Sequence, residues 1–167
     1  MTSPTLQSFP PLAVPGAQIL ILGNMPGDAS LQAQRYYAHP RNAFWGITAE
    51  LFGFDAAATY RDRVAALTGA GVAVWDVLRH CRRVGSLDSA VEPDSMVPND
   101  FAAFFAAHPT ITQVYFNGAA AEKNYHRLVT APDTMTYTRL PSTSPAQTMS
   151  YDRKLAAWRQ IKAAVRR

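Results

Sequence analysis

The sequence predicts an α/β fold, a three-layer α/β/α domain built on a four-stranded parallel sheet. Three observations predict it: four short apolar runs, helical periodicity between them, and segments rich in Gly, Pro, Asn or Ser directly after the runs. Strands that alternate with helices are typical of a parallel sheet covered on both faces. The chain has 167 residues, of which 48% are hydrophobic and 17% charged. We therefore expect a single globular domain over residues 1–167.

The predicted strands are short and apolar. They cover residues 18–23, 72–75, 112–116 and 136–140. An apolar run of this length, bounded by turn residues, indicates a strand that is buried on both faces. Residues 1–16 contain several prolines and are predicted to be an irregular lead-in, and residues 86–98 are predicted to be irregular as well.

Helices are predicted where apolar residues recur at helical spacing. They cover residues 43–54, 60–69, 100–107, 119–129 and 150–165. Asn99 or Asp100 is expected to cap the third of these helices, and Ser150 or Asp152 the last. Ligands bind beyond the carboxyl ends of such strands, so we expect the site in the loops 24–42, 76–80, 117–118 and 141–146.

Composition narrows the classes of function. The net charge of +4 raises the odds of a nucleic-acid partner only modestly, and a solvated basic surface is the better explanation of the charge by itself. Cys81 is the single cysteine, so no internal disulfide forms, and the four histidines lack zinc spacing. We therefore expect no metal site. We also expect no membrane contact and a cytoplasmic location, because neither an apolar span nor a signal peptide is recognisable.

The first motif follows the first strand and reads Gly23-Asn24-Met25-Pro26-Gly27. Its glycines and proline predict a tight turn whose exposed N–H groups can hold a carbonyl oxygen or a phosphate. An ordinary strand-to-helix turn explains the same residues. Neither a Walker loop nor a dinucleotide fingerprint is present.

The second motif, residues 36–45, reads YYAHPRNAFW. Tyr37 or Phe44 is predicted to stack on a flipped base, Arg41 to hold phosphate, and Asn42 to orient a water molecule. Trp45 is predicted to belong to the core. The alternative for Asn42 is a plain helix N-cap.

The third motif, PSTSPA at 141–146, places Ser142, Thr143 and Ser144 between two prolines. Short side chains let the backbone approach a ligand, and hydroxyl groups can bind phosphate oxygens. A polar surface turn is an equally good explanation of this motif by itself.

Taken together, the three motifs resemble the hypoxanthine-DNA glycosylase branch of the uracil-DNA glycosylase superfamily. The segments GVAVWDVLRHC and VYFNGAAAEK lie between them in the order that the superfamily requires. The resemblance implies a uracil-DNA glycosylase-like fold and hydrolysis of the N-glycosidic bond without a metal or organic cofactor. It implies DNA that contains a deaminated base as the partner, with hypoxanthine, uracil or xanthine as the base, and no obligatory protein partner.

The resemblance also implies roles for single residues. Asn42 would serve catalysis. The base pocket would contain Gly23, Asn24, Met25, Pro26, Gly27, Tyr37, Phe44, Asp76 and Asn117. The DNA-binding residues would be His39, Arg41, Ser142, Thr143, Ser144 and Pro145. Met25 stands where better-known members have Asp or Asn before the proline of this motif, so the usual water-activating carboxylate is missing.

Two alternatives remain at this point. One is a uracil-specific glycosylase, and the other is a non-catalytic nucleotide- or phosphate-binding module on the same sheet. Further phosphate contacts are expected from Arg35 and from the basic group Arg79, Arg82 and Arg83, although that group is equally explained as a solubilising surface.

Overall fold

The computed structural model describes residues 4–165 of the chain. Within this range a four-stranded parallel sheet has the strand order β3-β2-β6-β7. Its strands are β2 (Ile19–Gly23), β3 (Val72–Asp76), β6 (Gln113–Asn117) and β7 (Thr136–Leu140). The four predicted strands are confirmed, and their ends differ from the prediction by no more than one residue.

Strand β2 lies at the centre of the sheet because its side chains are apolar on both faces. Ile21 pairs with Val74 of β3 on one side and with Tyr115 of β6 on the other. Every residue of β2 is buried. The pairing leaves Gly23 opposite Asp76 at the carboxyl edge of the sheet.

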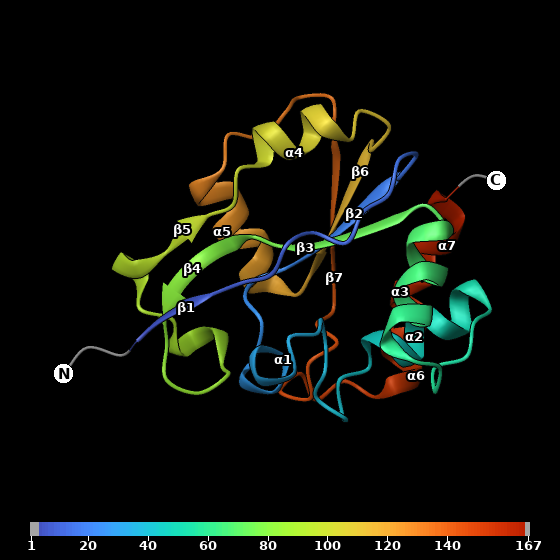
Figure 1. Cartoon of the computed structure of the whole chain (residues 1–167), viewed down its shortest axis with the longest axis horizontal. Helices are drawn as coiled ribbons and strands as arrows, with labels where there is room; N and C mark the ends of the chain where they lie inside the picture. The colour runs from blue at the N-terminus through green and yellow to red at the C-terminus, as the bar shows by residue number, and fades with distance from the viewer. Residues whose placement is uncertain (1–3, 166–167) are drawn as a thin grey trace.

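Helices cover both faces of the parallel sheet (Figure 1). Helices α4 (Phe101–Ala107) and α5 (Ala119–Leu128) lie on one side. Helices α2 (Phe44–Phe52), α3 (Tyr60–Gly69), α6 (Tyr151–Trp158) and α7 (Gln160–Ala164) lie on the other. The predicted three-layer α/β/α architecture is therefore confirmed. No helix among the described residues is long and apolar enough to cross a membrane.

The predicted helix caps are observed. The side chain of Asp100 accepts a hydrogen bond from the Ala103 N–H, and that of Ser150 accepts one from the Arg153 N–H. The last helix differs from the prediction, because the segment 150–165 forms two helices that meet at Arg159. Sequence periodicity continues across that junction, so the pattern alone does not show the break.

A second sheet was not predicted. It is antiparallel, has the order β1-β4-β5, and consists of β1 (Thr5–Gln7), β4 (Leu78–Arg82) and β5 (Val97–Pro98). The prediction of an irregular lead-in is therefore wrong for residues 5–7, and that of a loop over 76–80 is wrong for most of its length. The irregular segment 86–98 ends in β5 and contains two short 3₁₀ turns, Asp88–Ala90 and Pro93–Ser95.

The unpredicted strand β4 reads LRHCR and has no apolar run. It exists because its backbone pairs with a strand far away in the sequence, Thr5 lying opposite Arg82. Helix α1 (Asp28–Ala33), inside the predicted loop 24–42, was missed for a similar reason. The Ser86 hydroxyl accepts a hydrogen bond from the Asp28 N–H at 2.9 Å, so the start of this helix is fixed by a remote residue.

Candidate functional site

A cavity of about 150 Å³ lies at the carboxyl edge of the parallel sheet, and we call it the strand-end cavity. A cavity of about this volume holds one benzene ring in another protein. Predicted residues that line it are Gly23, Asn24, Met25, Pro26, Gly27, Tyr37, His39, Asn42, Asp76, Asn117, Ser142, Thr143, Ser144 and Pro145. Loops from distant parts of the sequence thus meet around one small space.

Gly23 marks the closest approach of polar groups to the backbone. A Cβ atom added there would lie 2.5 Å from Asp76 Oδ1 and 2.9 Å from the Tyr37 hydroxyl oxygen. Real Cβ atoms do not tolerate such distances. A glycine is therefore required for the Asp76 and Tyr37 side chains to converge over the end of β2.

Both polar atoms of the Asn24 side-chain amide make hydrogen bonds within the protein. Its Nδ2 donates to Asp88 Oδ1 at 3.1 Å, and its Oδ1 accepts from Asn124 Nδ2 at 2.8 Å. Asn24 is also buried. These bonds make Asn24 a rigid part of the cavity wall.

Arg83 fixes the backbone of the first motif by a hydrogen bond. Its guanidinium donates to the Pro26 carbonyl at 2.7 Å and to the Gly85 carbonyl at 2.6 Å. Only 2% of Arg83 is exposed. The expectation that Arg83 contacts phosphate is therefore wrong, because its guanidinium is buried and donates its hydrogen bonds to backbone carbonyls inside the protein.

The aromatic face of the cavity belongs to Tyr37. Its φ of 55° lies in the left-handed region, which a large side chain rarely adopts. The Tyr37 ring stacks on Phe44, with ring centroids 4.0 Å apart. Phe44 is fully buried and does not line the cavity, so its predicted stacking on a base is wrong. Phe44 packs behind Tyr37 instead and supports the strained residue.

The Tyr37 hydroxyl is buried and has no hydrogen-bond partner of normal geometry among residues 4–165. Burial, followed by the nearby Asp76 carboxyl, raises the pKa of Tyr37, against an opposing influence of the Asn117 amide. The hydroxyl therefore stays neutral and is a donor at the cavity floor.

Asn42 has a structural bond and a free side. Its Oδ1 accepts from the Phe44 N–H, two residues further on, at 2.9 Å, which is an Asx-turn bond at the start of helix α2. The N-cap residue of α2 is Ala43, so the predicted N-cap role of Asn42 is not observed. Its Nδ2 has no protein partner within the described chain, and the residue lines the strand-end cavity. The turn bond fixes the amide plane, while Nδ2 and the second lone pair of Oδ1 remain available.

The third motif is clamped to the end of β6. The Thr143 N–H donates to Asn117 Oδ1 at 2.9 Å, and Asn117 Nδ2 donates to the Thr143 hydroxyl at 3.0 Å. Thr143 is 1% exposed, so its predicted contact with the DNA backbone is not available to its side chain. The Thr143 carbonyl also accepts from the Ala43 N–H at 3.0 Å, which joins the second and third motifs.

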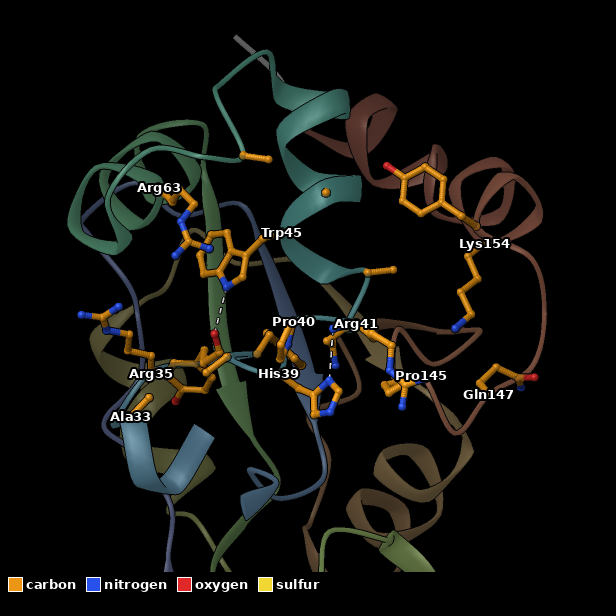
Figure 2. A pocket seen from close by; sticks show the side chains of 18 of the residues that line it. Ala33, Arg35, His39, Pro40, Arg41, Trp45, Arg63, Pro145, Gln147 and Lys154 are labelled. Carbon is orange, nitrogen blue, oxygen red and sulfur yellow. Dashed lines mark hydrogen bonds between the residues drawn. The ribbon is translucent and has the colours of Figure 1, made fainter. Parts of the chain in front are cut away.

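A larger groove of about 790 Å³ lies beside the cavity (Figure 2), and we call it the cationic groove. Its basic lining residues are Arg35, His39, Arg41, Arg63 and Lys154. Figure 2 shows Arg35 and Arg63 on one side, Lys154 on the other, and His39 and Arg41 between them. The groove shares five lining residues with the strand-end cavity, namely Tyr36, Tyr37, His39, Asn42 and Pro145. A basic groove of this kind attracts a polyanion.

Two contacts order the cationic groove. The Arg63 guanidinium lies 4.9 Å from the Trp45 ring centre, and the buried Trp45 donates from Nε1 to the Tyr36 carbonyl. The His39 Nδ1 accepts from the Arg41 N–H at 3.1 Å, so the neutral ring carries its proton on Nε2. That donor is exposed at the junction of groove and cavity.

Three carboxyl residues line the strand-end cavity, namely Asp28, Asp76 and Asp88, and Asp28 lies 3.8 Å from the Arg83 guanidinium. Asp76, at the end of β3, is 3% exposed, and its Oδ2 has no hydrogen-bond partner among the described residues. Burial, helped by the charge of Asp88 and opposed by that of Arg83, raises the pKa of Asp76 to about 7. Asp88 lies at an exposed position on the rim, with its carboxylate turned toward Asn24. Burial of that carboxylate raises the pKa of Asp88, against the hydrogen bond from Asn24 and the charge of Arg83.

The sequence analysis missed Asp88, Ser86 and the buried role of Arg83. All three lie in or next to the segment that was predicted to be irregular. The available signal was the dense polar run RRVGSLDS at 82–89, which is unusual in an unstructured connection. Its position against the first motif depends on the unpredicted antiparallel sheet.

Comparison with known proteins agrees with this geometry. The family model of the Uracil DNA glycosylase superfamily matches residues 10–165. A hypoxanthine DNA glycosylase of Methanosarcina barkeri (strain Fusaro) is 34% identical over 113 residues, which are 67% of this chain and 70% of the relative. A hypoxanthine DNA glycosylase of Methanosarcina acetivorans is 31% identical over 116 residues, 69% of this chain and 72% of the relative.

A solved structure has the same fold. It is the solution NMR structure of a candidate uracil DNA glycosylase from Methanosarcina acetivorans, with a TM-score of 0.79 and 26% identity. The superposition covers 95% of this chain and 96% of that protein.

The Asn117–Thr143 clamp leads to a stability prediction. Asn117→Ala removes both hydrogen bonds and leaves the buried Thr143 N–H without an acceptor. An unsatisfied buried group costs about 1–3 kcal/mol, so the free energy of unfolding should fall by about that amount. Urea denaturation measures the difference.

Thr143→Val is the matched control, because it removes only the hydroxyl and keeps the backbone bond. The double variant should cost less than the sum of the two single variants, since both break the same Asn117–hydroxyl contact. Strictly additive losses would show that the clamp does not act as a unit.

Proposed function

Because the chain belongs to the uracil DNA glycosylase superfamily, we propose that it hydrolyses the N-glycosidic bond of hypoxanthine in DNA. The observation that carries this proposal is a cavity with room for one base, directly beside a cationic groove. The chain is a DNA glycosylase by family, and its preference for hypoxanthine is supported by the names of its two relatives.

In this proposal the damaged nucleotide leaves the DNA stack, and its base enters the strand-end cavity. The Tyr37 ring, supported by Phe44, stacks on the base. The backbone N–H groups of Met25 and Gly27 lie at the cavity wall and hold acceptor atoms of the base. Phosphates flanking the flipped nucleotide contact the cationic groove through Arg41 and His39, while Ser142, Ser144 and Pro145 form the edge of the cavity that faces DNA.

Asn42 positions the attacking water. Met25 occupies the usual place of a carboxylate and cannot bind a water strongly, whereas the Asn42 amide lines the same cavity. The hydrogen bond from the Phe44 N–H holds the Asn42 side chain in one orientation. An amide orients a water molecule without taking its proton, so its contribution is to geometry in the transition state.

The decisive test is direct. The purified, folded protein is incubated with duplexes that contain deoxyinosine, deoxyuridine or deoxyxanthosine, and abasic sites are revealed by alkaline strand cleavage. We expect cleavage of the deoxyinosine duplex. Cleavage of deoxyuridine alone would make the protein uracil-specific, and binding without cleavage of any duplex would make it a non-catalytic module.

We expect Asn42→Ala to lower the single-turnover cleavage rate far more than it lowers DNA affinity. Loss of one oriented polar group of this kind is often worth about 10²–10³-fold in rate. The reason is that a water-positioning group acts mainly on the transition state. Single-turnover kinetics and a binding titration on the same duplex separate the two effects.

Asn42→Ser is the matched control, because a serine hydroxyl can make the same kind of turn bond but has no amide. Its rate should fall nearly as far as that of the alanine variant, while its melting temperature stays closer to that of the wild type. A serine variant that cleaves at the wild-type rate would make Asn42 a structural turn residue only.

DNA affinity should fall steeply with salt. Each phosphate contact adds about 0.9 to the slope of log affinity against log salt, so Arg41→Gln should reduce that slope by about 0.9. Arg127→Gln removes the same charge from helix α5, on the opposite face of the sheet, and should leave the slope unchanged. Equal effects of both variants would show that only net charge matters.

A further inference from the structure

Asp76 is a buried carboxyl residue at the end of β3. Its backbone is fixed, because Gly23 lies opposite it in the sheet and the Asn99 Nδ2 donates to its carbonyl at 2.8 Å. Its side chain lines the strand-end cavity, yet the buried Oδ2 has no hydrogen-bond partner among the described residues. A buried carboxylate without donors is costly, whereas a buried carboxylic acid needs only one acceptor.

The charges around Asp76 also disfavour its ionised form. The Tyr37 hydroxyl oxygen converges with Asp76 Oδ1 over Gly23, but no hydrogen bond joins them. From the 3₁₀ turn, Asp88 adds a negative charge. Arg83 is the cation that favours the ionised form of Asp76, and its guanidinium is bound to two carbonyls and lies 3.8 Å from Asp28.

Asp76 and Asp88 therefore have different environments. Asp88 accepts a hydrogen bond from Asn24, which stabilises its negative charge. The buried Oδ2 of Asp76 has no such donor, and Asp76 feels the charge of Asp88. When the surroundings of two carboxyl groups separate their pKa values, one group is protonated and can act as an acid while the other is ionised.

We propose that Asp76, in its neutral form, is the acid that donates a proton to the departing base. This inference rests on the proposed glycosylase function and adds the residue that neutralises the leaving group. The raised pKa of Asp76, about 7, agrees with it, because an acid that titrates near the working pH is both protonated and able to give up its proton.

The step balances as follows. The bond between C1′ of the sugar and N9 of hypoxanthine breaks, and its electron pair goes to the base. The Asp76 proton passes to an acceptor on the base edge that faces it, N7 or O6, so hypoxanthine leaves as a neutral molecule. Water bonds to C1′, and the proton it loses returns through solvent to the Asp76 carboxylate.

If Asp76 were an ionised hydrogen-bond acceptor instead, the rate would depend on pH in the opposite direction. An ionised Asp76 would accept a hydrogen bond from a base N–H, and the rate would rise with pH through about 7. A protonated Asp76 donates, so kcat/KM should fall by about ten-fold for each pH unit above its pKa. The acid role also relieves the repulsion between a departing anionic base and the carboxylate of Asp88.

The experiment measures kcat/KM on a deoxyinosine duplex from pH 5.5 upward, below the pH at which deoxyinosine itself ionises. We expect the wild type to decline above about pH 7, the pKa of Asp76. Asp76→Asn should lower the rate at pH 6 by about 10²-fold or more, the typical contribution of a general acid, and abolish the decline. Asp88→Asn keeps an acceptor for Asn24 but removes a charge, so it should move the decline to lower pH.

A second measurement does not depend on catalysis. The carboxyl ¹³C resonance of Asp76, assigned by its loss in Asp76→Asn, is titrated in the free protein. A midpoint near the ordinary value for aspartate, or a rate that is flat or rises with pH in an active enzyme, overturns the acid role and leaves the proposed function intact. If the folded protein shows the raised midpoint but cleaves no deoxyinosine at any pH, the proposed glycosylase function is wrong. The acid role of Asp76, which depends on that function, is then wrong as well.

Discussion

The pairing of β2 with a parallel strand on each side is the constraint on which the rest of the site depends. Parallel strands in register end at the same edge of a sheet, and β2, β3 and β6 therefore bring Gly23, Asp76 and Asn117 together. Because β2 is buried on both faces, a register shift of one residue would exchange buried apolar side chains throughout the core. The same force that buries the strand thus fixes the positions of the polar groups at its end.

Hydrogen bonds between loops convert that edge into a cavity. The third motif is attached to β6 through Thr143 and Asn117, and to helix α6 through Trp158, whose Nε1 donates to the Pro141 carbonyl at 2.8 Å. Lys154, which is buried, donates to the Ser144 carbonyl at 3.0 Å. The loop between the two prolines is therefore fixed before any ligand binds. Pre-organisation of this kind lowers the entropy that binding must overcome.

The unsatisfied polar atoms lie next to the cavity, not throughout the core. Buried side-chain atoms without a partner among the described residues are the Tyr37 hydroxyl oxygen, Asp76 Oδ2 and Arg83 Nη1. Tyr37 and Asp76 line the cavity, and Arg83 holds the first motif below it. Buried polar groups normally have partners, so their accumulation here agrees with a site whose missing partner is the substrate. The left-handed backbone of Tyr37 is a further strained feature at the same place.

The sequence by itself determined the parallel sheet, its covering helices and the family. Apolar runs and helical periodicity are local properties, and the three motifs are contiguous, so each is visible without any tertiary contact. Local sequence also predicted that the loop of Asn42 and the strand end of Asp76 lie near one another, because the carboxyl ends of parallel strands meet, and both residues line the strand-end cavity.

Only the tertiary structure decided how those residues are used. Strand β4 has no apolar run and forms because β1 pairs with it, and this pairing brings Asp88 against Asn24. Phe44 and Tyr37 look equally suited to stacking in the sequence, but packing buries Phe44 and leaves Tyr37 at the cavity. Arg83 looks like a surface charge and is instead enclosed. These outcomes depend on contacts between residues far apart in the chain, whose free energies no local pattern encodes.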